Sequence, residues 1–212
     1  LQAADTSYLS TAASMTLTVD KSNPTISFAD LTKNLDDSDF SLSVISSSTG
    51  TFTYSIANAS VAVVSGTTVS IVGAGSTLVE ATQASDSNYN SGSATMTLTV
   101  NKIAPTLTFS DVTKSYGDPD FELVPSSNSS GTFTYSIADS SIATVNGSSI
   151  SIVGAGTTII TVLQAADTSY LSTAASMTLT VDKSNPTITF NDINKRIGDA
   201  DFNLSATSNS TG

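Results

Sequence analysis

The sequence predicts an all-β protein, built as a tandem, end-to-end array of two-sheet sandwiches with about seven strands each. Two observations predict this class. Apolar and polar residues alternate with a period of two over several stretches, and no stretch shows a helical face. The whole pattern also returns every 81 residues without insertion or deletion, as Pro24, Pro105 and Pro186 show. The chain is therefore expected to repeat one small β unit.

The repeat also sets the expected domain boundaries. Residues 1–26 recur letter for letter at 163–188. The period is longer than the roughly 20–45 residues of a solenoid repeat and suits a small independent domain. Breaks after alternating runs place complete domains at 21–101 and 102–182. Residues 1–20 are then the C-terminal part of a preceding repeat, and 183–212 the N-terminal part of a following one. A first residue that is Leu, with no visible signal peptide, predicts an internal piece of a longer chain.

Within one period, each strand is expected where alternation is bounded by turn residues. Residues 95–100 and 132–137 alternate without a break, as is typical of antiparallel sheets with one buried face. Asn146-Gly147 predicts a hairpin, with Ser65-Gly66 at the same place in the first copy. The strands expected in the second domain are 105–110, 120–125, 132–138, 142–145, 149–153, 157–164 and 174–181. Seven short strands in about 80 residues predict an immunoglobulin-like sandwich.

The inward phases of these strands give an expected core. It comprises Phe121, Phe133, Tyr135, Ile152, Ile160, Met177 and Leu179. A buried Phe133 predicts a cost of roughly 3–5 kcal/mol for Phe133→Ala. Gly154 and Gly156 are expected in a tight turn with positive φ, which glycine adopts at little cost.

Composition excludes several classes of function. Seven Lys and Arg against 18 Asp and Glu give a net charge of −11, with a single Arg, so a phosphate-binding surface for nucleic acid is not expected. The chain has no His and no Cys, which excludes Ser-His-Asp triads, thiol nucleophiles, disulfides and zinc sites built on those ligands. No run of 18 apolar residues is present, so this segment is not expected to insert into a membrane. We therefore expect no enzyme.

Several segments of the repeat resemble the bacterial immunoglobulin-like (Big) domain, particularly group 2. They are 136–145, 152–160, 116–123 and 86–89, the last two similar to tandem versions in very long bacterial surface proteins. The first copy departs at Leu35-Asp36 and Asn58-Ala59, where the second has Tyr116-Gly117 and Asp139-Ser140. The resemblance covers essentially the whole chain. It implies surface display, adhesion or spacing at a bacterial cell surface, with no shared catalytic site.

The recurring carboxylates are the candidate metal ligands. Asp37 and Asp39 return as Asp118 and Asp120 in the second copy, and again at 199 and 201. Oxygen ligands at alternate loop positions are a weak calcium candidate, whereas Asp also caps turns and keeps an acidic surface soluble. We favour turn chemistry and expect no cofactor, because these pairs supply too few ligands for a dedicated calcium site.

Three other roles for the recurring polar residues remain as less favoured alternatives. Paired carboxylates are the groups that a glycosidase uses. Thr-x-Thr runs such as 95–99 give a hydroxyl-rich face for ice or glycans, although Thr also simply favours strands. Lys33, Lys114 and Lys195 are candidates for an intramolecular isopeptide bond, although an exposed Lys that discourages edge pairing is favoured.

The expected function is structural. The chain is interpreted as a spacer segment of a repetitive extracellular protein on a bacterial surface, an adhesin stalk or a surface filament. Its partners would be neighbouring repeats and, in a filament, other copies of itself. The alternative is an adhesion module whose loops bind a glycan or a protein receptor. The junction Val100–Pro105 has no Gly or Ser tract, and Pro105 biases Ala104 toward extended geometry, so a stiff rod is expected.

Overall fold

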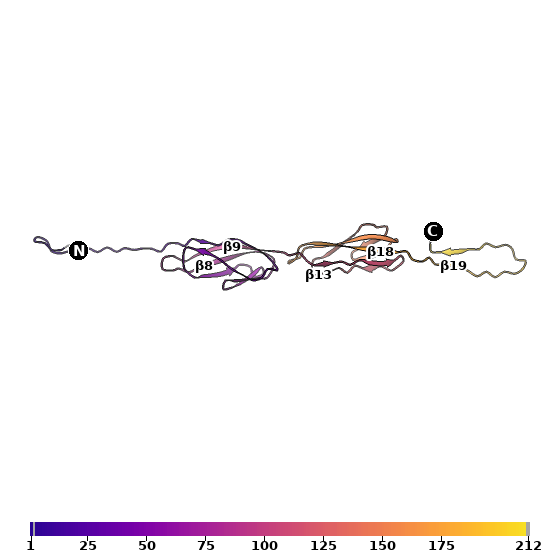
Figure 1. Cartoon of the computed structure of the whole chain (residues 1–212), viewed down its shortest axis with the longest axis horizontal. Helices are drawn as coiled ribbons and strands as arrows, with labels where there is room; N and C mark the ends of the chain where they lie inside the picture. Colours follow the sequence, from indigo (N-terminus) through magenta and orange to yellow (C-terminus); the bar gives the residue numbers. More distant parts are fainter. Residues whose placement is uncertain (2, 211–212) are drawn as a thin grey trace. The chain divides into compact units, whose positions relative to one another are not determined.

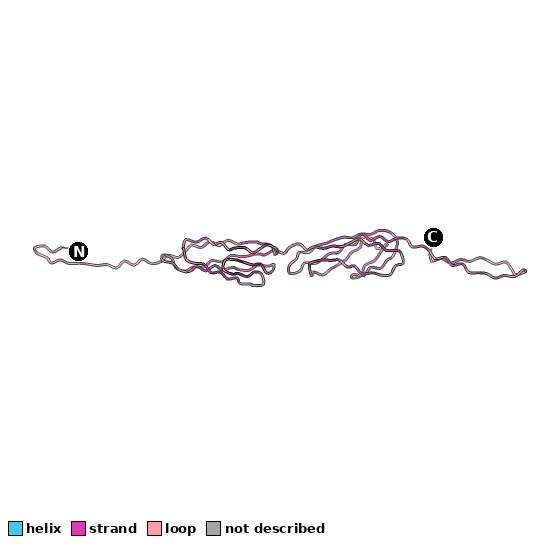
Figure 2. Tube along the Cα trace, turned by 60° about the horizontal axis from the view of Figure 1, so that its bottom comes forward, coloured by secondary structure: helices cyan, strands magenta, loops and turns pink. Residues whose placement is uncertain are grey.

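The computed structural model describes residue 1 and residues 3–210 and divides into two units, Leu1–Ile103 and Ala104–Gly212. Within the described residues the chain consists of strands and loops without a helix (Figure 2). Each unit contains one sandwich, and the predicted all-β sandwich fold is confirmed. The expected flanking parts of neighbouring repeats include residues 2, 211 and 212, which lie outside the described residues.

The first sandwich is formed by nine strands between residues 26 and 101. They are β1 (Ile26–Ser27), β2 (Leu31–Asn34), β3 (Phe40–Ser41), β4 (Ile45–Ser46), β5 (Phe52–Ile56), β6 (Ala62–Ser65), β7 (Thr68–Ile71), β8 (Gly75–Gln83) and β9 (Gly92–Asn101). One sheet has the order β2-β9-β8-β5 and the facing sheet the order β3-β7-β6, while β1 pairs with β4. Seven strands in two sheets of four and three match the immunoglobulin-like arrangement.

The second sandwich repeats this topology strand for strand. Its strands are β10 (Leu107–Thr108), β11 (Val112–Ser115), β12 (Phe121–Glu122), β13 (Ser126–Ser127), β14 (Phe133–Ile137), β15 (Ala143–Asn146), β16 (Ser149–Ile152), β17 (Gly156–Gln164) and β18 (Thr173–Asp182). The sheets are β11-β18-β17-β14 and β12-β16-β15, with β10 beside β13. Figure 1 labels β8 and β9, the long antiparallel pair of the first sandwich, and β18, the counterpart of β9.

The strand prediction needs two corrections. Strands β11 and β13 were not expected, and β12 covers only two residues of the expected 120–125. More important, β11 pairs with β18 in parallel, as β2 does with β9, whereas the alternating runs were interpreted as typical of antiparallel sheets. The first strand segment therefore changes sheets: β10 joins β13, and the chain then crosses over to β18 as β11.

The core of each sandwich lies where the inward phases of the two sheets meet. In the second sandwich Ile160, Met177 and Leu179 are buried as predicted, and Phe121, Tyr135 and Ile152 are partly buried against them. Phe133 is different. It is only half-buried and lies beside the Tyr135 ring, with 6.4 Å between centroids, rather than in the buried cluster. A cost below the predicted 3–5 kcal/mol is therefore expected for Phe133→Ala, because that range applies to fully buried rings.

Two predicted turns have different structural reasons for glycine. Gly147 has a φ of 61° in the hairpin between β15 and β16, as the Asn146-Gly147 pair predicted. Gly156 has a positive φ of 150°, but Gly154 does not, so the prediction was right for only one of these two. A Cβ on Gly154 would lie 2.6 Å from the backbone oxygen of Ser141, so this glycine is required by close approach.

Two further segments lie outside the sandwiches. Strands β19 (Ile188–Phe190) and β20 (Ala206–Ser208) form a two-stranded antiparallel pair whose residues are exposed. Residues 3–20 are exposed as well, and Met15 is 85% accessible although its counterpart Met177 is 2% accessible. Because residues 1–20 repeat 163–182 letter for letter, burial here depends on partner strands rather than on the local sequence.

Candidate functional site

The candidate calcium carboxylates lie in the loop that follows β2, and in its counterpart after β11. Asp37 accepts a hydrogen bond from the backbone N–H of Asn34 at 3.0 Å, and Asp118 from that of Ser115 at 2.9 Å. Asp39 accepts one from the Ser70 hydroxyl at 2.9 Å, and Asp120 one from that of Ser151 at 2.7 Å. The two carboxylates of a pair thus bind different partners: one closes its own turn, and the other accepts from the strand that pairs with β3 or β12.

These contacts are those of turn chemistry. Among the residues that the structure describes, no group of three or more His, Cys, Asp or Glu is placed to hold a metal ion. Calcium takes about six to eight oxygen ligands, and each Asp here already accepts a hydrogen bond within its own sandwich. The arrangement offers no cluster in which a cation would replace several hydrogen bonds at once.

A third carboxylate, Asp86, forms the densest polar centre of the first sandwich. One oxygen accepts hydrogen bonds from the backbone N–H groups of Asn88 and Tyr89, both at 2.8 Å. The other accepts from the Ser48 hydroxyl at 2.8 Å and from the Thr49 N–H at 2.9 Å. Because these donors stabilise the charged form, they hold the pKa of Asp86 well below its ordinary value.

The same centre returns in the second sandwich around Asp167. Its first oxygen accepts from the N–H groups of Ser169 and Tyr170, at 2.8 and 2.7 Å. Its second accepts from the Ser129 hydroxyl at 2.9 Å and from the Ser130 N–H at 2.8 Å. The backbone N–H groups of Ser169 and Tyr170 are the main reason that the pKa of Asp167 is also strongly lowered.

A buried glutamine beside each centre was not predicted. Gln83 is fully buried at the end of β8; its amide nitrogen donates to the backbone oxygens of Ser48 and Gly50 at 3.0 and 2.9 Å, and its oxygen accepts from Ser46 at 2.6 Å. Gln164 occupies the same place at the end of β17. The sequence held a signal, because Gln83 follows the buried Thr77, Val79 and Ala81 in strict alternation.

Together, the carboxylate and the glutamine fix one loop to the end of a long strand. The loop at 46–50 receives two hydrogen bonds from Gln83 and gives several to Asp86, and 127–131 is held in the same way. Every buried side-chain nitrogen or oxygen among the described residues has a hydrogen-bond partner. The hydrogen bonds of these centres thus join a loop to a strand within each sandwich.

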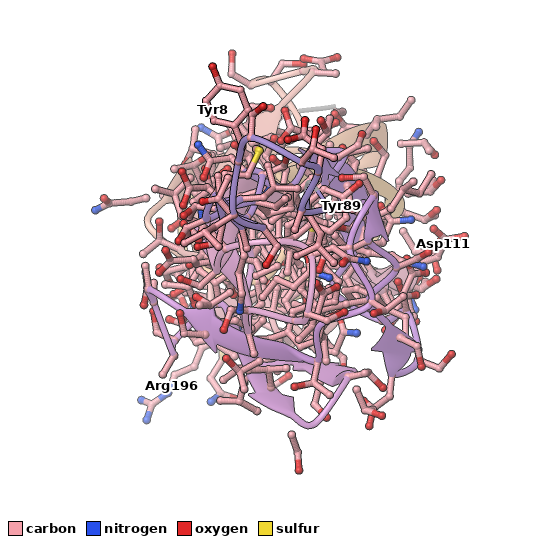
Figure 3. The ribbon with its side chains drawn as sticks, turned by 90° about the vertical axis from the view of Figure 1, so that its left-hand side faces the viewer. Tyr8, Tyr89, Asp111 and Arg196 are labelled. Carbon is pink, nitrogen blue, oxygen red and sulfur yellow. The ribbon has the colours of Figure 1, made fainter. Side chains whose placement is uncertain are left out.

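Asp30 and Asp111 cap the point where the first strand changes sheets. Asp30 accepts from the backbone N–H of Thr97 at 2.6 Å, and Asp111 from that of Thr178 at 2.7 Å. Figure 3 labels Asp111 and shows that it lies at the outside of the chain. Each carboxylate thus takes the place of a backbone carbonyl, which a neighbouring strand would otherwise offer to this N–H group of β9 or β18.

The second sandwich has a shallow cleft beside this crossover. Its volume is about 320 Å³, and its lining includes Phe109, Asp111, Glu122, Leu123 and Met177. Burial raises the pKa of Tyr135, and the nearby Glu122 carboxylate adds to that rise. The equivalent of Glu122 in the first copy is Ser41, so the charge of this cleft is not a property of the repeat.

One lysine of each repeat copy lies over an aromatic ring. The ammonium groups of Lys33, Lys114 and Lys195 lie 5.0, 5.1 and 5.1 Å from the ring centroids of Phe40, Phe121 and Phe202. The first two are on the edge strands β2 and β11, as an edge-protecting Lys would be. They are half-buried rather than fully exposed, because each ring covers part of the side chain. The cation–π contact is thus their common role.

The remaining conspicuous side chains point into solvent. Arg196 and Tyr8, both labelled in Figure 3, project from the chain, and Tyr8 is 72% exposed whereas its counterpart Tyr89 is half-buried in the first sandwich. The Thr-rich outer face of β9 is present as predicted, with Thr95 exposed and Thr97 and Thr99 half-buried. One pair on that face, Ser76 and Thr99, is joined at 3.3 Å between hydroxyls. No helix of the described residues is long and apolar enough to cross a membrane.

A scan against protein-family models and a search of curated proteins each find no match. Among solved structures, Drosophila N-cadherin EC1-4 is 18% identical with a TM-score of 0.34, and the alignment covers 76% of this chain and 50% of that one. Surface layer protein SbsC, domains 4–9, is 16% identical with a TM-score of 0.32, covering 81% and 31%. Drosophila OTK, extracellular domains 3–5, is 13% identical with a TM-score of 0.37, covering 74% and 62%.

The chain therefore spans half of the N-cadherin structure and about a third of the SbsC structure that it matches. The strands of the chain form two copies of an immunoglobulin-like sandwich in which the recurring polar residues hold the fold together.

Proposed function

We propose that the chain is a structural spacer segment of a repetitive extracellular protein on a bacterial cell surface, and not an enzyme. One observation carries the proposal. The carboxylates that recur every 81 positions, which include the calcium candidates Asp39 and Asp120, accept hydrogen bonds within their own sandwich at nearly the same distances in both copies. A repeat that is kept for catalysis or ligand binding would leave some of these groups turned outward and unpaired.

The competing proposal is an adhesion module that binds a glycan or a protein through its loops. The two proposals differ in what the loops do. In this chain the loop at 46–50 is hydrogen-bonded to Gln83 and Asp86 of its own sandwich. The loop at 127–131 is hydrogen-bonded to Gln164 and Asp167 in the same way. The observation favours a spacer, because loops that recognise a partner need free polar groups.

A glycan array probed with the full chain tests this choice. The spacer proposal expects no signal above the array background, either for the full chain or for a variant in which the cleft residue Glu122 is changed to Ser, the residue of the first copy. Reproducible binding of one glycan class, lost in Glu122→Ser, would overturn the spacer proposal in favour of adhesion. Binding that persists in this variant would do the same and would place the site elsewhere.

The same proposal includes folding without metal. Thermal unfolding in EDTA and in millimolar Ca²⁺ is expected to give midpoints within a few degrees of each other, because Asp37, Asp39, Asp118 and Asp120 are already paired with protein donors. A double variant, Asp37→Asn with Asp118→Asn, serves as the control. A large rise with Ca²⁺ that this variant abolishes would make these loops calcium sites.

A further inference from the structure

The outer side of the sheet β11-β18-β17-β14 in the second sandwich is a surface of uncharged residues. Alternation along the strands turns Ile160, Met177 and Leu179 into the core and the residues between them outward. We call these outward residues the uncharged face: Thr113, Ser115, Thr134, Ser136, Thr157, Ile159, Thr161, Leu163, Ala174, Ser176, Thr178 and Thr180. Asp182, at the end of β18, borders this face.

Thr161 lies in the middle of the uncharged face. Its cross-strand neighbours are Ser136 on β14 and Ser176 on β18, and its hydroxyl lies 3.0 Å from the Ser176 hydroxyl. On either side of it along β17, Ile159 and Leu163 are 52% and 50% exposed. The central hydroxyls thus bind each other, while two aliphatic side chains stay open to water. Burial of these side chains against a partner would be favourable.

The first sandwich differs at the centre of the same face. Glu80 is exposed at the place of Thr161, opposite Thr95 on β9. Thr82 stands where the second copy has Leu163. A partner packed on this face would remove water from the Glu80 carboxylate, which is costly unless the partner supplies a compensating charge. The two copies therefore share one sheet but differ in whether its outer side can be covered by an uncharged partner.

Charge restricts where two copies of this chain can meet. Each copy carries a net charge of −11, and like charges that face each other across a contact oppose it. The other sheet of the second sandwich carries the exposed Glu122 on β12, and Asp120 binds Ser151 on β16 of that sheet. The uncharged face avoids this repulsion, so it is the side of the second sandwich best suited to contact with another copy.

The size of the uncharged face is sufficient for a weak, specific contact. The nine residues of β17, at about 3.3 Å each, span roughly 30 Å, and four strands at about 4.8 Å give a width of roughly 19 Å. Two such faces together would bury on the order of 1,000 Å² of surface, which is near the lower limit for a specific interface between proteins. We therefore expect a transient contact rather than a permanent dimer.

We propose that the uncharged face is a docking surface for a second copy of this chain, which presents the same face. When like faces meet about a two-fold axis, one patch serves both partners, as in most protein dimers. Thr161 lies at the centre of this contact, and Ile159 and Leu163 of each copy are buried against the partner. Glu80 keeps the first sandwich out of the contact. The proposal goes beyond the spacer function, because it adds lateral association at one defined copy of the repeat.

Sedimentation of the full chain over a range of protein concentrations tests the contact. We expect monomers at low concentration and dimers at millimolar concentration. Added salt should favour the dimer, because it screens the repulsion between two chains that each carry a charge of −11. A chain that stays monomeric at millimolar concentration in high salt would overturn the proposal.

Thr161→Glu locates the contact on the uncharged face. We expect the dissociation constant to rise at least tenfold, because the variant places two carboxylates together at the centre of the interface. The first sandwich already has Glu80 at this position, so the fold accepts the residue. Thr144→Glu is the matched control: it makes the same change at an exposed position of β15, on the other sheet. If both variants weaken the dimer equally, the proposal is wrong.

The reverse change tests the role assigned to Glu80. Glu80→Thr combined with Thr82→Leu gives the first sandwich the central residues of the second. Each chain would then present two docking faces, and we expect species larger than the dimer, because a chain with two such faces can join two partners. A dimer as the largest species would contradict the proposal that Glu80 is what keeps the first sandwich from associating.

The result is separable from that of the spacer proposal. A monomeric chain with no glycan binding rejects self-association and leaves the spacer. A dimer that Thr161→Glu disrupts, together with specific glycan binding, rejects the pure spacer and leaves the docking surface. A monomeric chain that binds a glycan only when residue 161 is Thr would assign the uncharged face to a polysaccharide and would overturn both proposals.

Discussion

At the scale of single residues, the recurring carboxylates serve as hydrogen-bond acceptors for donors of the chain's own fold. Asp86 and Asp167 each accept from two consecutive N–H groups and from a loop on another strand. Asp139 binds the N–H and the hydroxyl of Ser141, and the Asn58 that replaces it in the first copy binds Ser60 in the same way. The substitution keeps the oxygen acceptor and loses only the charge.

The lowered pKa of Asp167 predicts a loss of stability in acid. Because the folded-state pKa lies below the ordinary value of 3.8, the stabilisation is present above about pH 4 and is lost as the pH falls through the folded-state value. Asp167→Asn should therefore be less stable than the unsubstituted chain at pH 7, with the difference shrinking by pH 2. Urea unfolding followed by the NMR signals of the buried Leu179 methyl groups measures this.

Asp182→Asn is the matched control for Asp167→Asn. It removes one charge from the same sandwich at a position where the first copy already has Asn101. Its effect on the urea midpoint should be small. If Asp167→Asn shows no greater pH dependence than this control, the hydrogen bonds of Asp167 do not couple to stability.

At the scale of the strands, the alternation of apolar and polar residues correctly predicted the long strands and did not predict the short ones. The alternation at 95–100 and 132–137 correctly gave β9 and β14, because one face of each is buried. Strand β11, Val112–Ser115, has four residues, and only one of them is apolar, which is too short a pattern to separate from a turn. Its parallel pairing is set by the crossover at Asp111, a tertiary feature without a local signal.

Burial was predicted less well at strand ends, where the two sheets no longer overlap fully. Phe133 has the correct inward phase but begins β14, so it is only half-buried. Gln164 is the opposite case: it ends β17 and is fully buried because the loop at 127–131 folds over it and meets its amide. The position of a residue in the alternation predicts only which face of the sheet its side chain is on. Whether that side chain is buried also depends on the loops that pack over it.

Close packing of that loop predicts a strong effect of one added methyl group. A Cβ on Gly131 would lie 1.8 Å from the backbone oxygen of Ala165, so Gly131→Ala forces two backbone segments apart. We expect a cost of about 3 kcal/mol or more, at the upper end of typical overpacking. In Gly147→Ala the new Cβ meets nothing within 4 Å, and only the positive φ of 61° costs roughly 1–2 kcal/mol.

Chemical denaturation of the two variants measures this difference. Both variants replace one Gly by Ala. Gly147→Ala measures the conformational cost of a positive φ, whereas Gly131→Ala measures the cost of the steric clash. Equal midpoints for the two variants would mean that the 127–131 loop moves away freely, which would contradict the anchoring by Gln164.

At the scale of the whole molecule, each sandwich contains all the contacts that its own core needs. The residues packed in the first core lie between 28 and 100, and those in the second between 109 and 181. We therefore expect residues 102–182 to fold alone and to give a dispersed β-sheet NMR spectrum, whereas residues 163–182 alone should not. A disordered spectrum for 102–182 would refute autonomous folding and the boundaries proposed from the repeat.

The expected rod is a prediction about two such domains in solution. A junction without Gly, in which Pro105 restricts Ala104, should keep 21–101 and 102–182 apart. The long strands β9 and β18 span roughly 30 Å each. With polar loops this gives roughly 35–40 Å per domain, so small-angle scattering on 21–182 should give a maximum dimension of roughly 70–80 Å. A value near 50 Å, about that of two domains lying side by side, would refute the rod.

The constant register of the repeat has a consequence for how such a chain changes over generations. Removing 102–182 would join Asn101 to Lys183 and recreate a junction with Pro186 at the place of Pro105. A cut and rejoining 81 residues apart inside two sandwiches would also yield one whole hybrid sandwich, because equivalent residues make equivalent bonds. Recombination between copies can thus lengthen or shorten the protein by whole 81-residue units without an unfolded product. The length of the protein can therefore change under selection in discrete steps of one domain.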